Sequence, residues 1–108
     1  MNGSCVFCKI VSGGKAEKLI YQDDEIVAFN DNNPRTPTHI MIVPKSHYGD
    51  FAEMMAKNAE MLTKIGQVVE KLVDQVGIRG PYTWGFHAGG KQSVNHVHAS
   101  LLAGMKKD

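Results

Sequence analysis

A long run of apolar residues at helical spacing, set between strand-like segments, constrains the fold of this chain most. Between residues 51 and 76 the apolar positions recur every three or four residues, which is the period of a helix with one buried face. Asp50 followed by Glu53 resembles a capping box, and Gly77 is a natural helix stop. Because the stripe weakens at Lys57 and Asn58, one continuous helix and a short helix followed by a long one both fit.

The segments around this helix have the composition of strands. Short runs rich in β-branched and aromatic residues, bounded by turn-forming residues, predict strands at residues 19–22, 25–30, 39–43, 82–87 and 93–102. A short helix is expected over residues 5–11, closed by the glycines that follow. About five strands with one long helix predict an α+β fold built on an antiparallel sheet.

Length and charge exclude several classes of protein. A chain of 108 residues with 43% hydrophobic content is expected to form a single domain over residues 1–108. The net charge of +1 provides no electrostatic footprint for nucleic acid. No apolar run approaches the roughly 18 residues of a membrane span, and no signal peptide is evident, so we expect a soluble cytoplasmic protein without a membrane partner.

His96 and His98 are the first candidate functional residues. They stand two positions apart in an apolar, strand-like run, so both rings are expected on one face, about 6.5–7 Å apart along the chain. Histidine changes charge near neutral pH, which suits phosphate chemistry or metal binding. Two histidines on a solvated strand are the simpler interpretation of such a pair. Ser93 and the Gly89-Gly90 turn just upstream favour a site for an anion.

Cys5 and Cys8 allow three interpretations. A thioredoxin-like redox pair is disfavoured because no strand precedes the motif and no βαβ pattern follows it. Two buried structural thiols are a reasonable alternative. The third is half of a tetrahedral zinc site, for which His47 and His96 are available donors.

Three further polar residues stand at the ends of predicted strands. His39 opens a strand after a proline-rich loop, and His87 closes another. Asp31 begins the proline loop, where it either forms an Asx turn or accepts hydrogen bonds from a ribose diol.

Three ordered blocks of the chain together resemble the histidine triad (HIT) superfamily, in particular its small nucleotide-binding, phosphoramidase-like branch. The blocks are the CVFCKIVSG opening, the run IVAFND followed by PRTPTHIMIVPKSH, and the segment QSVNHVH. The resemblance covers nearly the whole chain. It implies a HIT-like fold, a homodimer whose sheets join, and a bound purine nucleotide such as AMP or GMP.

The same resemblance implies roles for individual residues. His98 is expected to attack the α-phosphorus and form a nucleotidyl-histidine intermediate, with a backbone carbonyl holding its ring in one tautomer. Around it, Ser93, Gln92, His96 and His39 match active-site positions, and Asp31 matches the ribose-binding carboxylate. Phe7, Ile10, Phe29 and Asn32 match the base pocket. Cys5, Cys8, His47 and His96 match the ligands of a structural zinc ion.

Two departures from the family pattern matter. Ser100 stands where the third triad histidine is expected; as a nucleotide-binding residue it can donate a hydrogen bond to a phosphate oxygen, but serine cannot carry a positive charge. Losing such a stabilising donor typically costs on the order of 10²–10³ in rate, so a weakly catalytic or non-catalytic nucleotide-binding module is the alternative to an active hydrolase. The loop before Gln92 is also short, and His87 stands near the place of a phosphate- or ribose-contacting asparagine.

Overall fold

The computed structural model describes residues 18–31, 34–87 and 96–104. The elements within these ranges are, in order, β1 (Leu19–Gln22), β2 (Ile26–Asn30), β3 (Thr38–Pro44), α2 (Phe51–Lys57), α3 (Glu60–Val76), β4 (Tyr82–Phe86) and β5 (Ala99–Ala103). The predicted α+β class, with a five-stranded sheet and one long helix, is confirmed. The short helix predicted over residues 5–11 lies outside the described residues.

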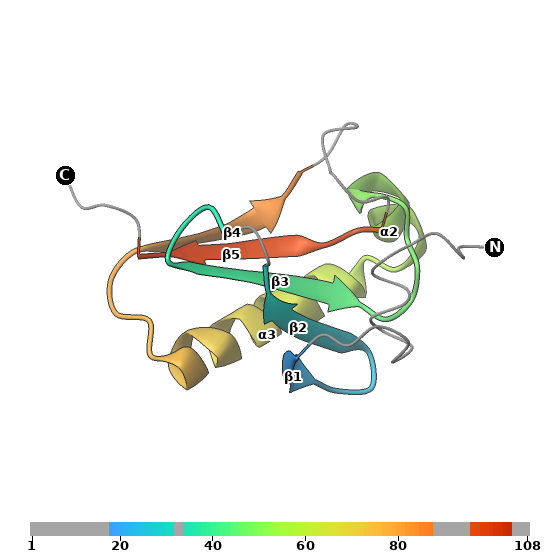
Figure 1. Cartoon of the computed structure of the whole chain (residues 1–108). Helices are drawn as coiled ribbons and strands as arrows, with labels where there is room; N and C mark the ends of the chain where they lie inside the picture. The colour runs from blue at the N-terminus through green and yellow to red at the C-terminus, as the bar shows by residue number, and fades with distance from the viewer. Residues whose placement is uncertain (1–17, 32–33, 88–95, 105–108) are drawn as a thin grey trace.

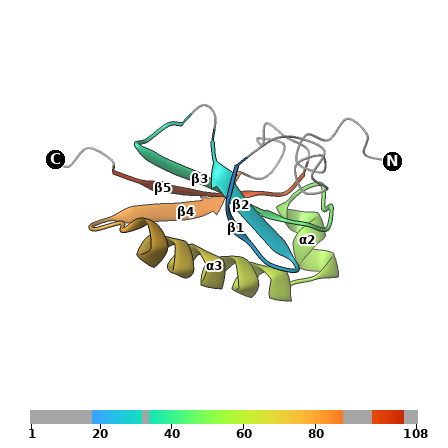
Figure 2. The same cartoon turned by 60° about the horizontal axis from the view of Figure 1, so that its bottom comes forward.

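The five strands form one antiparallel sheet in the order β1-β2-β3-β5-β4. Both described helices lie along the same face of this sheet (Figures 1 and 2). Since side chains alternate along a strand, each central strand sends one set of residues toward the helices and the other set to the opposite face. Ile40, Ile42 and Leu101 belong to the helix side, whereas Met41 and Ser100 face the other way.

The predicted strand over residues 93–102 is confirmed over residues 99–102 and wrong over residues 96–98. β5 begins only at Ala99, so His96 and His98 belong to the segment that leads into the strand. In that segment the N–H of Val97 donates to the Tyr48 carbonyl 2.6 Å away, so a loop residue takes the place of a strand partner. Val97 still packs into the core, as the predicted alternation requires.

Of the two alternatives for the helical region, the short helix followed by a long one is confirmed. The N–H of Asn58 donates to the carbonyl of Met54 and closes α2 before α3 begins at Glu60. The predicted cap is present as well, because Asp50 Oδ1 accepts from the Glu53 N–H over 2.9 Å. Gly77 ends α3 with a φ of 75°, a backbone conformation that favours glycine.

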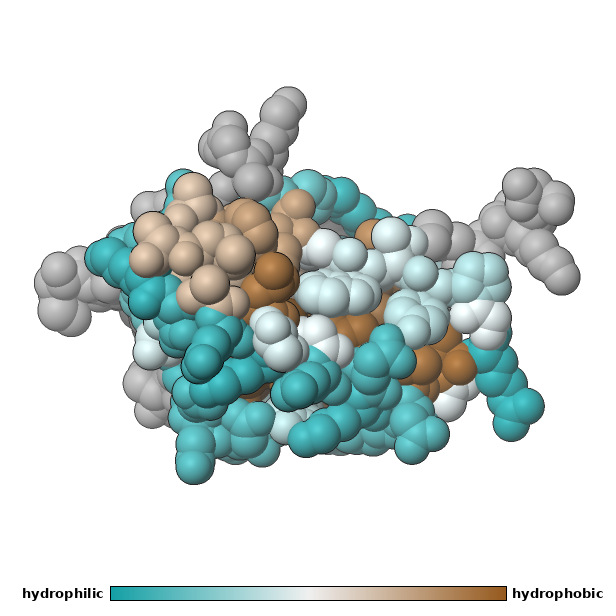
Figure 3. Space-filling model, turned by 180° about the vertical axis from the view of Figure 1, so that it is seen from behind, coloured by the Kyte–Doolittle hydropathy of each residue, from teal (hydrophilic) through white to brown (hydrophobic). Residues whose placement is uncertain are grey.

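The core lies between α3 and the sheet. Its fully buried side chains include Ile65, Val69 and Leu72 from the helix and Ile42 and Leu101 from the strands. Seen from behind, hydrophilic side chains cover much of the surface, and apolar ones gather toward the end where α2 lies (Figure 3). No helix among the described residues has both the length and the apolar character needed to cross a membrane.

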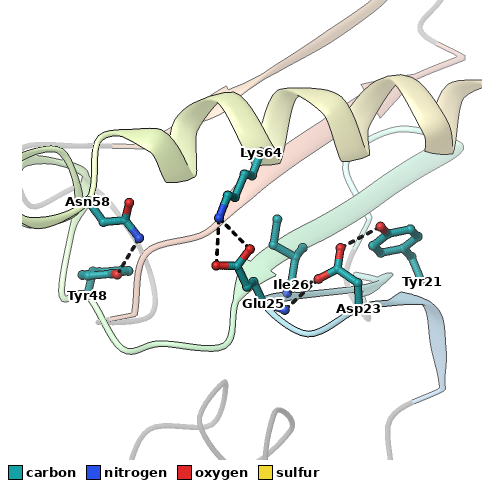
Figure 4. Close-up of polar contacts among 7 residues, drawn as sticks. All are labelled: Tyr21, Asp23, Glu25, Ile26, Tyr48, Asn58 and Lys64. Atoms are coloured by element: carbon teal, nitrogen blue, oxygen red, sulfur yellow. Dashed lines mark hydrogen bonds and ion pairs between the residues drawn. The ribbon is translucent and has the colours of Figure 1, made fainter.

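Polar contacts tie the β1–β2 turn to itself and to α3 (Figure 4). Asp23 Oδ1 accepts from the N–H groups of Glu25 and Ile26 over 2.7 and 2.8 Å, and so forms the turn. Lys64 of α3 then donates to both carboxylate oxygens of Glu25 over 2.7 and 2.9 Å. This exposed ion pair links α3 to the β1–β2 turn, and it contributes little to the free energy of unfolding.

Candidate active site

The sheet face opposite the helices collects most of the described site candidates. Phe29, Met41, Ser100 and Gly85 are successive cross-strand partners, so they form one row across four strands. Cross-strand partners share a face. The next row begins at Asp31, whose N–H donates to the His39 carbonyl over 2.9 Å.

His98 lies next to this row, immediately before β5. Its side chain is buried, and its Nδ1 lies 2.9 Å from the His96 carbonyl oxygen. An N–H must donate to a carbonyl, so the proton is on Nδ1 and the ring's lone pair is on Nε2. Burial lowers the pKa of His98 more than the bond to the His96 carbonyl raises it. The ring is therefore a neutral imidazole at pH 7, the form that acts as a nucleophile.

His39 and Asp31 form a polar pair on the same face. His39 Nδ1 accepts from the Arg35 N–H over 3.1 Å, so the proton of the neutral ring is on Nε2, which lies 3.3 Å from Asp31 Oδ2. Burial lowers the pKa of His39, and the carboxylate of Asp31 opposes that effect in part. Because the Asp31 side chain is 26% exposed, it remains accessible to a ligand hydroxyl group.

Ser100 lies at the edge of a pocket of about 180 Å³ between β4 and β5. Its hydroxyl makes a weak contact with the sulfur of Met41 at 3.7 Å. Gly85 lies opposite Ser100 and leaves the space above it open, since a Cβ there would have no neighbour within 4 Å. The pocket is smaller than the roughly 300–1,000 Å³ of sites that enclose a whole drug-sized ligand. Its lining residues are Thr83, Trp84, Gly85, Phe86, His87, Ser100 and Leu102.

His96 and His47 form a second, separate cluster near the end of β3. Their Nδ1 atoms lie 3.1 Å apart, and His96 Nε2 donates to the Pro44 carbonyl over 2.9 Å. Burial lowers the pKa of His96 to about 4, so this ring is neutral at physiological pH. His96 and His98 both precede β5, but their rings contact different groups: His96 contacts His47 and the Pro44 carbonyl, and His98 contacts the His96 carbonyl.

Two ring nitrogens facing each other are compatible with a metal between them. Nitrogens bound to one tetrahedral zinc ion at about 2.0–2.1 Å each lie about 3.3–3.4 Å apart, close to the observed 3.1 Å. The bond from His96 Nε2 to a backbone carbonyl is the kind of contact that orients a metal-bound histidine. Residues 18–31, 34–87 and 96–104 contain no group of three His, Cys, Asp or Glu side chains that could hold a metal ion.

Sequence reasoning named only part of this site. The predicted residues Cys5, Phe7, Cys8, Ile10, Asn32, Gln92 and Ser93 lie outside the described residues. Met41 and Gly85 could not be singled out from the sequence, because their place beside Ser100 depends on the strand order. The carbonyls of Pro44 and His96, which orient His96 and His98, carry no side-chain signal that a sequence pattern could reveal.

Comparison with known proteins shows similarity over most of the chain. The family model described as "Scavenger mRNA decapping enzyme C-term binding" matches residues 4–107. A 14 kDa zinc-binding protein of Zea mays is 34% identical over 103 residues, which cover 92% of this chain and 80% of that protein.

Solved structures agree over the full length of the chain. A histidine triad protein from Clostridium difficile superposes with a TM-score of 0.92 at 34% identity, covering 100% of this chain and 96% of that one. A HIT family hydrolase from Clostridium thermocellum gives a TM-score of 0.91 at 32% identity with the same coverage. With the family model, these similarities establish that the chain belongs to the histidine triad superfamily.

Proposed function

We propose that this protein hydrolyses purine nucleoside phosphoramidates or related nucleotide conjugates, or transfers their nucleotidyl group, through a covalent intermediate on His98. The observation that carries the proposal is the state of that ring. Its Nδ1–H donates to the His96 carbonyl over 2.9 Å, and burial lowers its pKa. A neutral imidazole whose lone pair is on Nε2 is prepared for attack at phosphorus.

The reaction follows from this tautomer in two displacements. In the first, the Nε2 lone pair forms a bond to the α-phosphorus, and the bond from phosphorus to the leaving nitrogen or oxygen breaks. The leaving group keeps that electron pair and takes a proton from water. In the second, a water oxygen bonds to phosphorus, the N–P bond returns its electrons to Nε2, and water's proton goes to solvent. One difficult substitution is thereby divided into two easier ones.

The proposed nucleotide site lies on the face of the sheet opposite the helices. Phe29 lies in the same cross-strand row as Ser100, on the face proposed to bind the nucleotide. Asp31, held near His39, supplies a carboxylate for a ribose hydroxyl. Five further proposed site residues lie outside the described residues. The proposed base pocket includes Phe7, Ile10 and Asn32, and the proposed phosphate site includes Gln92 and Ser93. AMP and GMP are the expected products.

We further propose a structural zinc ion held by Cys5, Cys8, His47 and His96. The Nδ1 atoms of His47 and His96 lie 3.1 Å apart, and the similarity to a zinc-binding relative gives independent support. Zinc there would fix the segment that carries the His96 carbonyl, and so the tautomer of His98. Metal analysis of protein purified without added zinc should give about one ion per chain, and His47→Ala should lose it. Equal metal content in the two proteins would contradict this assignment.

Turnover of adenosine 5′-phosphoramidate tests the catalytic proposal. The wild-type protein should release AMP, while His98→Ala should release none above the uncatalysed rate. Circular dichroism and the melting temperature control for folding of the variant. Equal AMP release by the two folded proteins would eliminate His98 as the nucleophile.

Ser100 favours one alternative, a nucleotide-binding or interaction module with little chemistry. Calorimetric titration with AMP distinguishes the two functions, because a module binds AMP without turning over the phosphoramidate.

The family resemblance also supports a homodimer, and β1 and β4 are the edges of the described sheet at which strands could join. Light scattering should then give twice the mass of one chain.

A further inference from the structure

His87 stands beside the position that lacks the third triad histidine. β4 and β5 end their pairing at Phe86 and Ala99, which are cross-strand partners. His87 directly follows the first of these residues, and His98 directly precedes the second. The two histidines therefore flank the same end of the β4–β5 ladder, one on each strand.

The space between His87 and Ser100 is a pocket. Both residues line the same cavity of about 180 Å³. Gly85, the cross-strand partner of Ser100, leaves this space open because it has no side chain. A group seated over Gly85 and Ser100 would thus be within reach of the His87 ring at the pocket wall.

Electrostatics agrees with this placement. The charge of His87 lowers the pKa of His39, after the larger effects of burial, Asp31 and Arg35. His87 is itself exposed, so its ring is accessible to a ligand while its charge acts on the buried His39 ring.

We infer that His87 takes over the role of the missing third triad histidine, with its imidazole N–H donating to a phosphoryl oxygen of the substrate above Gly85 and Ser100. The inference rests on the proposed hydrolase function and names a further catalytic residue for it. In this arrangement the imidazole reaches the phosphate from β4 instead of β5. With an imidazole supplied from the other side of the pocket, a serine at position 100 does not weaken catalysis.

An exchange of side chains tests the inference. The variants are His87→Asn, Ser100→His and the double variant, with Lys71→Gln as a control that removes an exposed cation from the helix face. Each is assayed for kcat and KM with adenosine 5′-phosphoramidate and for AMP affinity, beside wild-type protein and His98→Ala. A catalytic imidazole predicts that His87→Asn lowers kcat by about 10²-fold and changes KM and AMP affinity by less than about threefold. The double variant should recover to within about tenfold of wild-type kcat, because it places an imidazole on the other side of the same pocket.

The outcomes separate this inference from the proposed function. If wild-type turnover exceeds that of His98→Ala but His87→Asn keeps full kcat, His87 has no catalytic role and the hydrolase proposal stands. If His87→Asn lowers kcat and the double variant does not recover it, His87 does not replace the third triad histidine. The same conclusion follows if His87→Asn raises KM and weakens AMP binding but leaves kcat unchanged. If wild-type protein is no more active than His98→Ala, both proposals fail.

Discussion

At His39, burial and a neighbouring carboxylate act in opposite directions on one imidazole. Burial lowers its pKa, and the charge of Asp31 raises it again in part. Asp31→Asn removes the charge that favours protonation. The variant should therefore show a His39 pKa lower than that of wild-type protein, which NMR titration of the ring protons measures directly. An unchanged His39 titration would show that the 3.3 Å contact carries no electrostatic coupling.

The same substitution has a consequence for stability in acid. The pKa of His39 is lower in the folded protein than the value of about 6.5 expected in the unfolded chain. Above pH 6.5 both states are neutral and the full stability is present; below it the unfolded chain takes up the proton first, and stability falls. Because Asp31→Asn lowers the folded pKa further, its free energy of unfolding relative to wild type should drop more at pH 5 than at pH 7.5. Urea titrations at both values test this, and Asp74→Asn, which removes an exposed carboxylate from α3, should show no such pH-dependent difference.

At the scale of elements, α3 offers two glycines at which one substitution should have opposite effects. Gly66 lies inside the helix, where alanine is favoured by about 1 kcal/mol, and its added Cβ would meet Trp84 at an ordinary contact of 3.4 Å. Gly77 ends the helix with a φ of 75° and no neighbour within 4 Å, so alanine there costs about 1–2 kcal/mol through backbone strain alone. Urea unfolding should show Gly66→Ala stabilised and Gly77→Ala destabilised. Two shifts of the same sign would contradict this account of the helix end.

The helix and its ends were predictable from sequence because their signals are local. The cap at Asp50 and the stop at Gly77 depend on residues within one or two turns of the helix. The start of β5 was not predictable, because the segment before it is held by the Tyr48 carbonyl, 49 residues from Val97 along the chain. For the site, strand alternation correctly separated Ser100 from the core residue Leu101. The contact of Ser100 with Gly85 required the strand order, which no local pattern contains.

At the scale of the whole molecule, the sheet separates the packed core from the proposed site. Its helix side holds the tightly packed core, where Ile65 is fully buried. Its other side carries the polar and titratable residues, Asp31, His39, His87, His98 and Ser100. Since strand side chains alternate, adjacent residues of β5 serve different purposes, with Leu101 in the core and Ser100 at the pocket. Substitutions on the two sides should therefore have distinct effects.

Ile65→Val on α3 tests this separation. Removing one buried methylene group from a packed core typically costs about 0.5–1.5 kcal/mol, so the melting temperature should fall by several degrees. Because Ile65 lies on the helix side of the sheet, the affinity for AMP and the kcat for adenosine 5′-phosphoramidate should stay at wild-type values well below the melting temperature. Ser100→Val is the matched substitution on the other side: it replaces the hydroxyl at the pocket with an apolar group and should weaken AMP binding, with a smaller effect on melting. If Ile65→Val weakens AMP binding as much as Ser100→Val does, the two faces are mechanically coupled and the separation is wrong.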